Sequence, residues 1–407
     1  MSRLLRSRLG ALPVLLALVF ALPACDSGGG GEEVTPDRIQ FGLNYTRLFS
    51  APTAAEVQAV RADWDSRNPS SSNASVVASA SVDGATVSIV EHTVTSRGGG
   101  SVTHYGAVRV PAGAAALPVL VVHHGGDNGF SVSAGSANTG VRQFAMAFPD
   151  LAASTVQVFP VYRSETISTA GYAALGGPYT AGGTESPWDY DVDDAIALLD
   201  AVRGLAEFSA TVDDARAAVI GFSRGGNTAA LHAIRDASVT ALVDYYGPTD
   251  FFNEGAQRLA TGVLVGDPGA LGLPGAQFLL DNVLDPLRNA DASYNASADY
   301  ASARLEVIRR SASAFEGDLP DTQVHHHYQD GVVPVVFSQA FEAAADGGSG
   351  GSFDVFYYGT AGAATDGLFH APELTPDMRA SIPQVQSFLS AQLNTGVARR
   401  PALARAY

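Results

Sequence analysis

The sequence predicts an α/β fold with a mostly parallel, doubly wound sheet that carries helices on both faces. From residue 117 onward, short β-branched runs alternate with longer helix-like runs, the pattern that right-handed β–α–β crossovers produce. The run LPVLVVH at 117–123 is continuously apolar, which indicates a strand buried on both faces. No internal repeat or second sheet is evident, so we expect a single α/β domain over residues 85–395.

The first 24 residues predict an export signal. Arginines at positions 3, 6 and 8 precede a Pro-broken apolar run that is short for a spanning helix. The run ends in Leu22-Pro23-Ala24-Cys25, which resembles the bacterial lipobox, and Cys25 is the only cysteine, so no internal disulfide can form. We therefore predict a lipoprotein signal peptide at 1–24 and a lipidated Cys25 that anchors the protein at the periplasmic face or the cell surface. An ordinary cleaved signal peptide with an incidental cysteine is the alternative.

A flexible acidic and Gly-rich tether at 25–36 leads into the folded part of the chain. Residues 37–84 predict a helical and extended segment packed on the core. Its helix at 53–67 starts with Thr53, and Glu56 follows three residues later, a spacing typical of a capping box. Two β-rich runs at 85–96 and 101–111 are joined by RGGG, which predicts an antiparallel pair of strands with a glycine turn.

Strands and helices then alternate toward the C-terminus. Further strands are predicted at 155–163, 216–222, 239–248, 322–330 and 353–362, and helices at 188–205, 227–237, 333–346 and 377–393. Residues 251–321 interrupt this alternation with helical pieces of their own, and we interpret them as a cap over the site. Residues 396–407 form a C-terminal tail.

The charge balance excludes polyanionic partners. The chain has 41 acidic residues against 24 basic ones, a formal net charge of −17. Such a chain repels nucleic acid and anionic lipid head groups, and no Lys/Arg cluster provides a local exception. We therefore expect no nucleic-acid partner, and contact with a membrane only through the N-terminal lipid anchor.

The stretch GFSRG at 221–225 predicts a nucleophilic serine on a tight turn. The turn strains the backbone of Ser223 and brings neighbouring elements close, so glycines are needed two residues before and two after it. The match lies directly after the strand-like RAAVI and directly before the helix-like NTAALHAI. This strand–turn–helix context distinguishes the motif from a chance match in a chain with 43 glycines.

A serine hydroxyl needs a base and an oriented carboxylate to become a nucleophile. Where the serine comes first in the chain, the acid and then the histidine follow it. Of the nine histidines, only His370 lies beyond the last strand, on the loop AATDGLFHAPEL. Asp330, at the end of the strand at 322–330, is the preferred acid, and Asp250, after the preceding strand, is its rival. Asp354 and Asp366 are interpreted as residues without a catalytic role.

The oxyanion of the reaction needs two N–H donors. We expect one from the backbone of Arg224, the residue after the nucleophile. The other should come from the loop HHGGDNG after the buried strand at 117–123, where the candidates are Gly125, Gly126 and Asp127, with Gly126 preferred.

Two further features have two interpretations each. The run His325-His326-His327 suggests a metal, but strand side chains alternate between faces and no ligand set completes a site, so we expect packing histidines and no metal or cofactor. Arg163 and Glu165, at the end of the strand at 155–163, either bind substrate or form a structural ion pair.

With these residues in place, the chain resembles the α/β-hydrolase superfamily. It is most similar to the catalytic domain of the prolyl oligopeptidase and acylaminoacyl-peptidase group and to dienelactone-hydrolase-like esterases. The resemblance rests on HHGG, SPWDYDVDDAIALLDAV, GFSRGGNTAA, YYGPTD and HHHYQDGVVPVVFSQ. It implies an α/β-hydrolase fold with a cap insertion, and it places the nucleophile, acid and base on Ser223, Asp330 and His370.

The expected function is therefore that of an extracytoplasmic serine hydrolase acting on a small-molecule ester or peptide. The stretch before residue 85 is too short for the β-propeller of those peptidases, which favours esters over peptides. The alternatives are a peptidase without the propeller and a non-catalytic surface lipoprotein that uses the same scaffold for binding.

Overall fold

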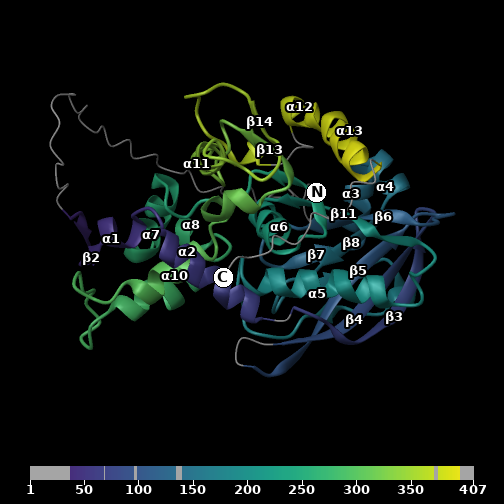
Figure 1. Cartoon of the computed structure of the whole chain (residues 1–407), viewed down its shortest axis with the longest axis horizontal. Helices are drawn as coiled ribbons and strands as arrows, with labels where there is room; N and C mark the ends of the chain where they lie inside the picture. The colour runs from purple at the N-terminus through teal and green to yellow at the C-terminus, as the bar shows by residue number, and fades with distance from the viewer. Residues whose placement is uncertain (1–36, 68, 96–98, 134–139, 371–374, 395–407) are drawn as a thin grey trace, which may run out of the picture. The chain divides into compact units, whose positions relative to one another are not determined.

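A nine-stranded sheet forms the centre of the computed structural model, which describes residues 37–67, 69–95, 99–133, 140–370 and 375–394 (Figure 1). The strand order is β14-β13-β12-β11-β6-β8-β5-β4-β3. Their bounds are β3 Ser72–Val82, β4 Ala85–Thr95, β5 Ser101–Val110, β6 Leu117–His123, β8 Val156–Pro160, β11 Val212–Phe222, β12 Val239–Tyr245, β13 Asp321–His327 and β14 Phe353–Tyr358. The predicted signal peptide, Cys25, the tether and the C-terminal tail lie outside the described residues.

The sheet divides into a parallel and an antiparallel part. From β8 through β6, β11, β12 and β13 to β14, every neighbouring pair is parallel. β5 pairs with β8, and β4 with β5, in antiparallel register. The mostly parallel fold and the N-terminal antiparallel pair are therefore confirmed.

The antiparallel part has one strand more than the sequence predicted. β3 pairs with β4 along the edge of the sheet, and its residues alternate between exposed and half-buried positions. Its sequence, SNASVVASASV, is rich in Ser and Ala, which are weak strand formers, so the run was hidden in the segment 37–84. The sheet thus begins before residue 85.

Helices cover both faces of the sheet. Alternate residues of each central strand face opposite ways, so Val119 and Val121 lie in one hydrophobic cluster while Leu120 and Val122 lie in the other. The first face is covered by α2 (Ala54–Ser66), α5 (Tyr190–Gly204), α6 (Arg224–Arg235) and α11 (Val336–Ala345). The second is covered by α3 (Val141–Ala147), α4 (Pro149–Ser154) and α13 (Ser381–Asn394). The predicted capping box at the start of α2 is present between Thr53 and Glu56.

The insertion, residues 251–320 between β12 and β13, is helical. It contains α7 (Glu254–Val265), α8 (Pro268–Leu271), α9 (Ala276–Leu279) and α10 (Ala301–Ile308), with a π-helical turn at Leu280–Leu284 and 3-10 turns at Asp285–Leu287 and Ala312–Asp318. No described helix of the chain is long and apolar enough to cross a membrane.

The insertion shares a hydrophobic core with the start of the described chain. Strands β1 (Ile39–Gln40) and β2 (Leu43–Asn44) lead into α1 (Tyr45–Phe49), whose label lies near those of α7 and α10 in Figure 1. The buried side chains of this cluster include Leu43, Tyr45, Leu48, Phe49, Ala260, Val263, Leu284, Tyr300 and Val307. Residues 37–50 therefore pack on the insertion, whereas the sequence predicted packing on the main core.

Polar contacts reinforce this junction. The hydroxyl of Tyr300 accepts a hydrogen bond from the backbone N–H of Asn44 at 2.8 Å. The guanidinium of Arg304 binds the Glu56 carboxylate at 2.6 Å and donates to the carbonyl oxygens of Arg47 at 2.6 Å and Ser50 at 3.0 Å. The hydrogen bonds from Arg304 lower the pKa of Glu56 to about 2, against a smaller opposing effect of burial. The junction is thus both apolar and ionic.

Four buried histidines make the fold sensitive to acid. Burial lowers the pKa of His123 well below its usual value and lowers that of three others, His92, His124 and His325, to about 3. An unfolded histidine titrates at about 6.5, so between these two values the unfolded chain binds more protons than the folded one. These histidines therefore leave stability intact above pH 6.5 and destabilise the fold progressively as the pH falls toward 3.

Three buried carboxyl groups, Glu165, Asp244 and Asp191, act in the opposite direction, because burial raises the pKa of each. Burial raises the pKa of Glu165 and Asp244 to about 7, so the folded state binds protons first as the pH falls from 7. Because the histidines outnumber these groups, we expect the free energy of unfolding to be lower at pH 5 than at pH 7. Urea denaturation at the two pH values measures this difference. Equal or greater stability at pH 5 would contradict the prediction.

Candidate active site

Ser223 lies on the turn between β11 and α6, in a strained backbone conformation. Its φ of 55° and ψ of −125° are rare for a residue with a side chain. The flanking glycines make the turn possible: a Cβ on Gly221 would lie 1.9 Å from the carbonyl oxygen of Gly225, and one on Gly225 would lie 2.3 Å from that of His123. The predicted strand–turn–helix context is therefore present.

The three predicted catalytic side chains form a hydrogen-bonded row. Asp330 follows β13, and His370 follows β14 after the 3-10 turn Gly367–Phe369. The Nε2 atom of His370 is 2.8 Å from Ser223 Oγ, and its Nδ1 atom is 2.7 Å from Asp330 Oδ2. Since an ionised carboxylate only accepts hydrogen bonds, His370 carries its proton on Nδ1 and presents the Nε2 lone pair to the serine hydroxyl.

The surroundings of Asp330 keep it ionised and fixed. Burial alone would raise its pKa, but the neighbouring rings of His326 and His370 lower it to about 2. Its Oδ1 atom accepts hydrogen bonds from the backbone N–H groups of Val332 at 2.8 Å and Val333 at 3.0 Å. One oxygen of the carboxylate is thus held by the backbone, and the other faces His370.

Asp250, the rival acid, forms hydrogen bonds that fix the local backbone. Asp250 Oδ1 accepts from the backbone N–H groups of Phe252 at 2.7 Å and Asn253 at 2.8 Å, and its Oδ2 accepts from Ser313 at 2.7 Å. It therefore fixes the turn that leads into α7. Asp366 contributes backbone hydrogen bonds beside Asp330, and Asp354 is exposed on β14.

The two predicted oxyanion donors lie on adjacent elements. Arg224 is the first residue of α6, so its backbone N–H has no acceptor within the helix. Gly126 lies in the loop after β6 with φ of +76°, a conformation that favours glycine. The carbonyl oxygen of Gly126 accepts a hydrogen bond from Nη1 of Arg224 at 3.2 Å, which joins the loop to the helix.

Arg163 and Glu165 do not pair with each other: each forms an ion pair with another residue, and neither lines the pocket at Ser223. The side chain of Arg163 is 1% exposed and donates to Asp194 at 2.6 and 2.8 Å and to the carbonyl oxygen of Thr95 at 2.9 Å. Glu165 is also buried, with its carboxyl group bound to the Arg224 guanidinium. Both side chains are bound by protein partners, which favours a structural role for each of them over the predicted substrate contact.

The three consecutive histidines are packing residues. His325 stacks between Tyr245 and Phe356, and His327 stacks on Phe369. His326 binds Ser338 Oγ at 2.6 Å and the carbonyl oxygen of Val333 at 2.9 Å. Within the described ranges, no group of three or more His, Cys, Asp and Glu side chains is placed to hold a metal ion.

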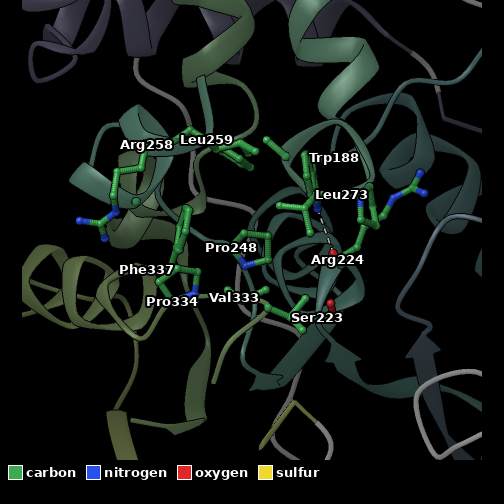
Figure 2. A pocket seen from close by; sticks show the side chains of 15 residues that line it. Trp188, Ser223, Arg224, Pro248, Arg258, Leu259, Leu273, Val333, Pro334 and Phe337 are labelled. Atoms are coloured by element: carbon green, nitrogen blue, oxygen red, sulfur yellow. Dashed lines mark hydrogen bonds between the residues drawn. The ribbon is translucent and has the colours of Figure 1, made fainter. Parts of the chain in front are cut away.

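An apolar pocket of about 260 Å³ opens beside Ser223 (Figure 2). The insertion supplies one wall, and the loop after Asp330 supplies another. Its lining residues are Trp188, Ser223, Arg224, Pro248, Phe251, Gly255, Arg258, Leu259, Ala270, Leu273, Pro274, Val332, Val333, Pro334 and Phe337. Sequence reasoning missed this pocket, because the apolar residues that form it are scattered over four separate segments and follow no period.

These features together define the α/β-hydrolase fold: a mostly parallel sheet with a serine elbow after β11, an acid after β13 and a histidine after β14. Acetyl xylan esterase 1 from Thermoanaerobacterium sp. JW/SL YS485 has this fold in common with the chain, with a TM-score of 0.52, 16% sequence identity, and coverage of 85% of this chain and 97% of that one. A ligand-bound form of the rice cell wall degrading esterase LipA from Xanthomonas oryzae gives a TM-score of 0.50 and 16% identity, with 80% and 100% covered. No protein-family model and no curated protein matches the sequence.

Proposed function

We propose that this protein is a serine hydrolase that cleaves carboxylic esters through an acyl-enzyme intermediate. The observation that carries the proposal is the hydrogen-bonded row from Ser223 through His370 to Asp330, at 2.8 and 2.7 Å, on a strained serine elbow. Strain of this kind persists only where the surroundings over-determine it, and here it presents the serine hydroxyl to the pocket.

The reaction follows from the positions of these groups. Ser223 Oγ attacks the ester carbonyl while His370 Nε2 takes its proton, and the resulting oxyanion is stabilised by the Arg224 N–H and the loop at Gly126. His370 then returns the proton to the departing alcohol, which leaves the acyl group on Ser223. A water molecule, deprotonated by the same nitrogen, releases the acid and restores the serine. The ionised Asp330 stabilises the imidazolium in both steps.

The pocket supports an apolar substituent on the substrate. Its volume of about 260 Å³ exceeds the ~150 Å³ of an apolar cavity that holds benzene, so a medium-length alkyl or an aromatic group fits. We assign this space to the acyl group, because that group stays attached to Ser223, which lies at the pocket wall. The pocket is therefore larger than an acetyl group requires.

A graded series of p-nitrophenyl esters tests the proposal. We expect kcat/KM to rise about fourfold for each CH₂ group from acetyl to hexanoyl, because each buried CH₂ contributes ~0.8 kcal/mol. Replacing Leu273→Trp should fill the pocket and remove this gain, whereas Leu271→Trp, on the exposed surface of α8, is the matched control.

Other outcomes discriminate between the candidate functions. Strong turnover of aminoacyl or peptidyl p-nitroanilides with weak ester turnover would make the protein a peptidase. If kcat/KM does not change with acyl length but rises with the length of the alkyl group in a series of alkyl acetates, the pocket binds the alcohol part of the ester. Absence of turnover on all substrates would overturn the proposal and favour the binding lipoprotein.

A further inference from the structure

The side chain of Arg224 is buried beneath the predicted oxyanion loop and has no part in the reaction steps above. It is 1% exposed, and its guanidinium lies over the ring of Tyr162 at 4.7 Å. Nη1 donates to the carbonyl oxygen of Gly126 and to Glu165, and Nη2 donates to Asp191 at 2.7 Å. This one side chain therefore joins the loop after β6, the segment after β8 and the first turn of α5.

The loop carbonyls are held by two side chains. His124 Nδ1 lies 3.0 Å from the carbonyl oxygen of Gly125, and Arg224 Nη1 lies 3.2 Å from that of Gly126. In a trans peptide the C=O group and the following N–H point in opposite directions. Holding these two carbonyls therefore sets the directions of the N–H groups of Gly126 and Asp127. Because φ of Gly126 is +76°, where glycine moves freely, the loop needs such contacts to keep one conformation.

The charge states of the groups around Arg224 are consistent with a fixed cluster. Burial lowers the pKa of His124 to about 3, so the ring is neutral, and its Nδ1–H donor leaves an acceptor at Nε2. That Nε2 atom lies 3.5 Å from Glu165 Oε2, whose pKa burial raises to about 7. The neighbouring carboxyl groups keep Arg224 charged although burial opposes it.

We propose that the Arg224 side chain is a positioning residue for the oxyanion hole. Its guanidinium holds the carbonyl of Gly126 and so keeps the loop in a fixed position relative to the backbone N–H of Arg224. The inference rests on the proposed function, because it concerns the stabilisation of the oxyanion in that reaction. One residue then supplies one donor through its backbone and, through its guanidinium, fixes the direction of the Asp127 N–H, one of the candidates for the other donor.

The test compares an ester with its thionoester in the full-length protein. Sulfur is a weak hydrogen-bond acceptor, so a thionoester gains little from an oxyanion hole. For Arg224→Lys we expect kcat on p-nitrophenyl butyrate to fall about 10- to 100-fold, less than the ~100- to 1,000-fold seen when a donor is removed outright. KM for the ester should stay within about twofold of the wild-type value. The kcat on the thionoester should fall much less than the kcat on the ester, so the ester-to-thionoester ratio of kcat falls.

A matched control is available shortly after β8. Arg163 is equally buried and bound to the carboxylate of Asp194, but it does not contact the loop at Gly126. Arg163→Lys should leave the ester-to-thionoester ratio unchanged. If Arg224→Lys fails to fold, Asp191→Asn weakens the same anchor and should lower the ratio in the same direction.

The outcomes separate this inference from the proposed function. If the wild-type protein hydrolyses the ester but the ester-to-thionoester ratio is unchanged in both Arg224→Lys and Asp191→Asn, only the positioning role is overturned. A parallel loss on ester and thionoester would do the same, since it indicates only a smaller folded fraction. Absence of ester turnover in the wild-type protein would overturn the proposed function itself.

Discussion

Replacing Ser223 by alanine should lower kcat/KM for p-nitrophenyl butyrate by about 10⁵-fold or more, because no nucleophile remains at the elbow. His370→Ala should cause a similar loss, and the double variant should be no worse than either single one, since the two side chains act as one unit in the attack. Initial rates at high enzyme concentration measure all three, and circular dichroism checks their folding. Ser209→Ala, at an exposed turn, is the control and should keep full activity.

The non-additivity is the decisive part of this experiment. If the losses of Ser223→Ala and His370→Ala multiplied in the double variant, the two residues would be acting independently, and the direct proton transfer between them would be wrong. Residual turnover that is unaffected by Ser223→Ala would point to a different nucleophile.

Asp330→Asn should reduce kcat about 10⁴-fold at neutral pH by forcing the wrong tautomer on His370. Two backbone N–H groups, from Val332 and Val333, bind Oδ1 of Asp330, so the amide oxygen of asparagine must occupy that place. Its NH₂ group then faces Nδ1 of His370, which has to accept. The ring consequently carries its proton on Nε2 and no longer accepts the serine proton.

The rival carboxylate provides the matched control. Asp250 is also bound by two backbone N–H groups and a hydroxyl, so Asp250→Asn changes a similar environment without touching His370. We expect its kcat to stay within about tenfold of wild type. A larger loss from Asp250→Asn than from Asp330→Asn, measured on the same ester, would exchange the roles of the two residues.

The sequence predicted the parallel strands and three side chains that the structure places in hydrogen-bond contact, because their positions follow from chain order. Strands β6, β11 and β12 contain apolar runs, and Ser223, Asp330 and His370 each follow a strand at the same edge of the sheet. Parallel strands with right-handed crossovers put their carboxyl ends together, so order alone suffices.

What the sequence did not predict depends on contacts between distant segments. The roles of Arg163 and Glu165 were left open because the partners that occupy them, Asp194 and Arg224, lie about 30 and 60 positions further along the chain. The apolar pocket is assembled from the insertion and three loops, and no local pattern indicates which of its apolar side chains meet. The edge strand β3 was missed because Ser and Ala are weak indicators of a strand.

The junction between residues 37–50 and the insertion has a consequence for folding. Its hydrogen bonds join residues that are 216 positions apart, in the pair Tyr45 and Thr261, and 256 apart, in the pair Asn44 and Tyr300. Contacts between such distant residues form late, because a long loop must close before they are gained. The insertion also supplies a wall of the pocket, so local unfolding of this junction would open the site without disturbing the sheet. One wall of the pocket beside Ser223 therefore belongs to a small subdomain whose two halves lie far apart in the chain.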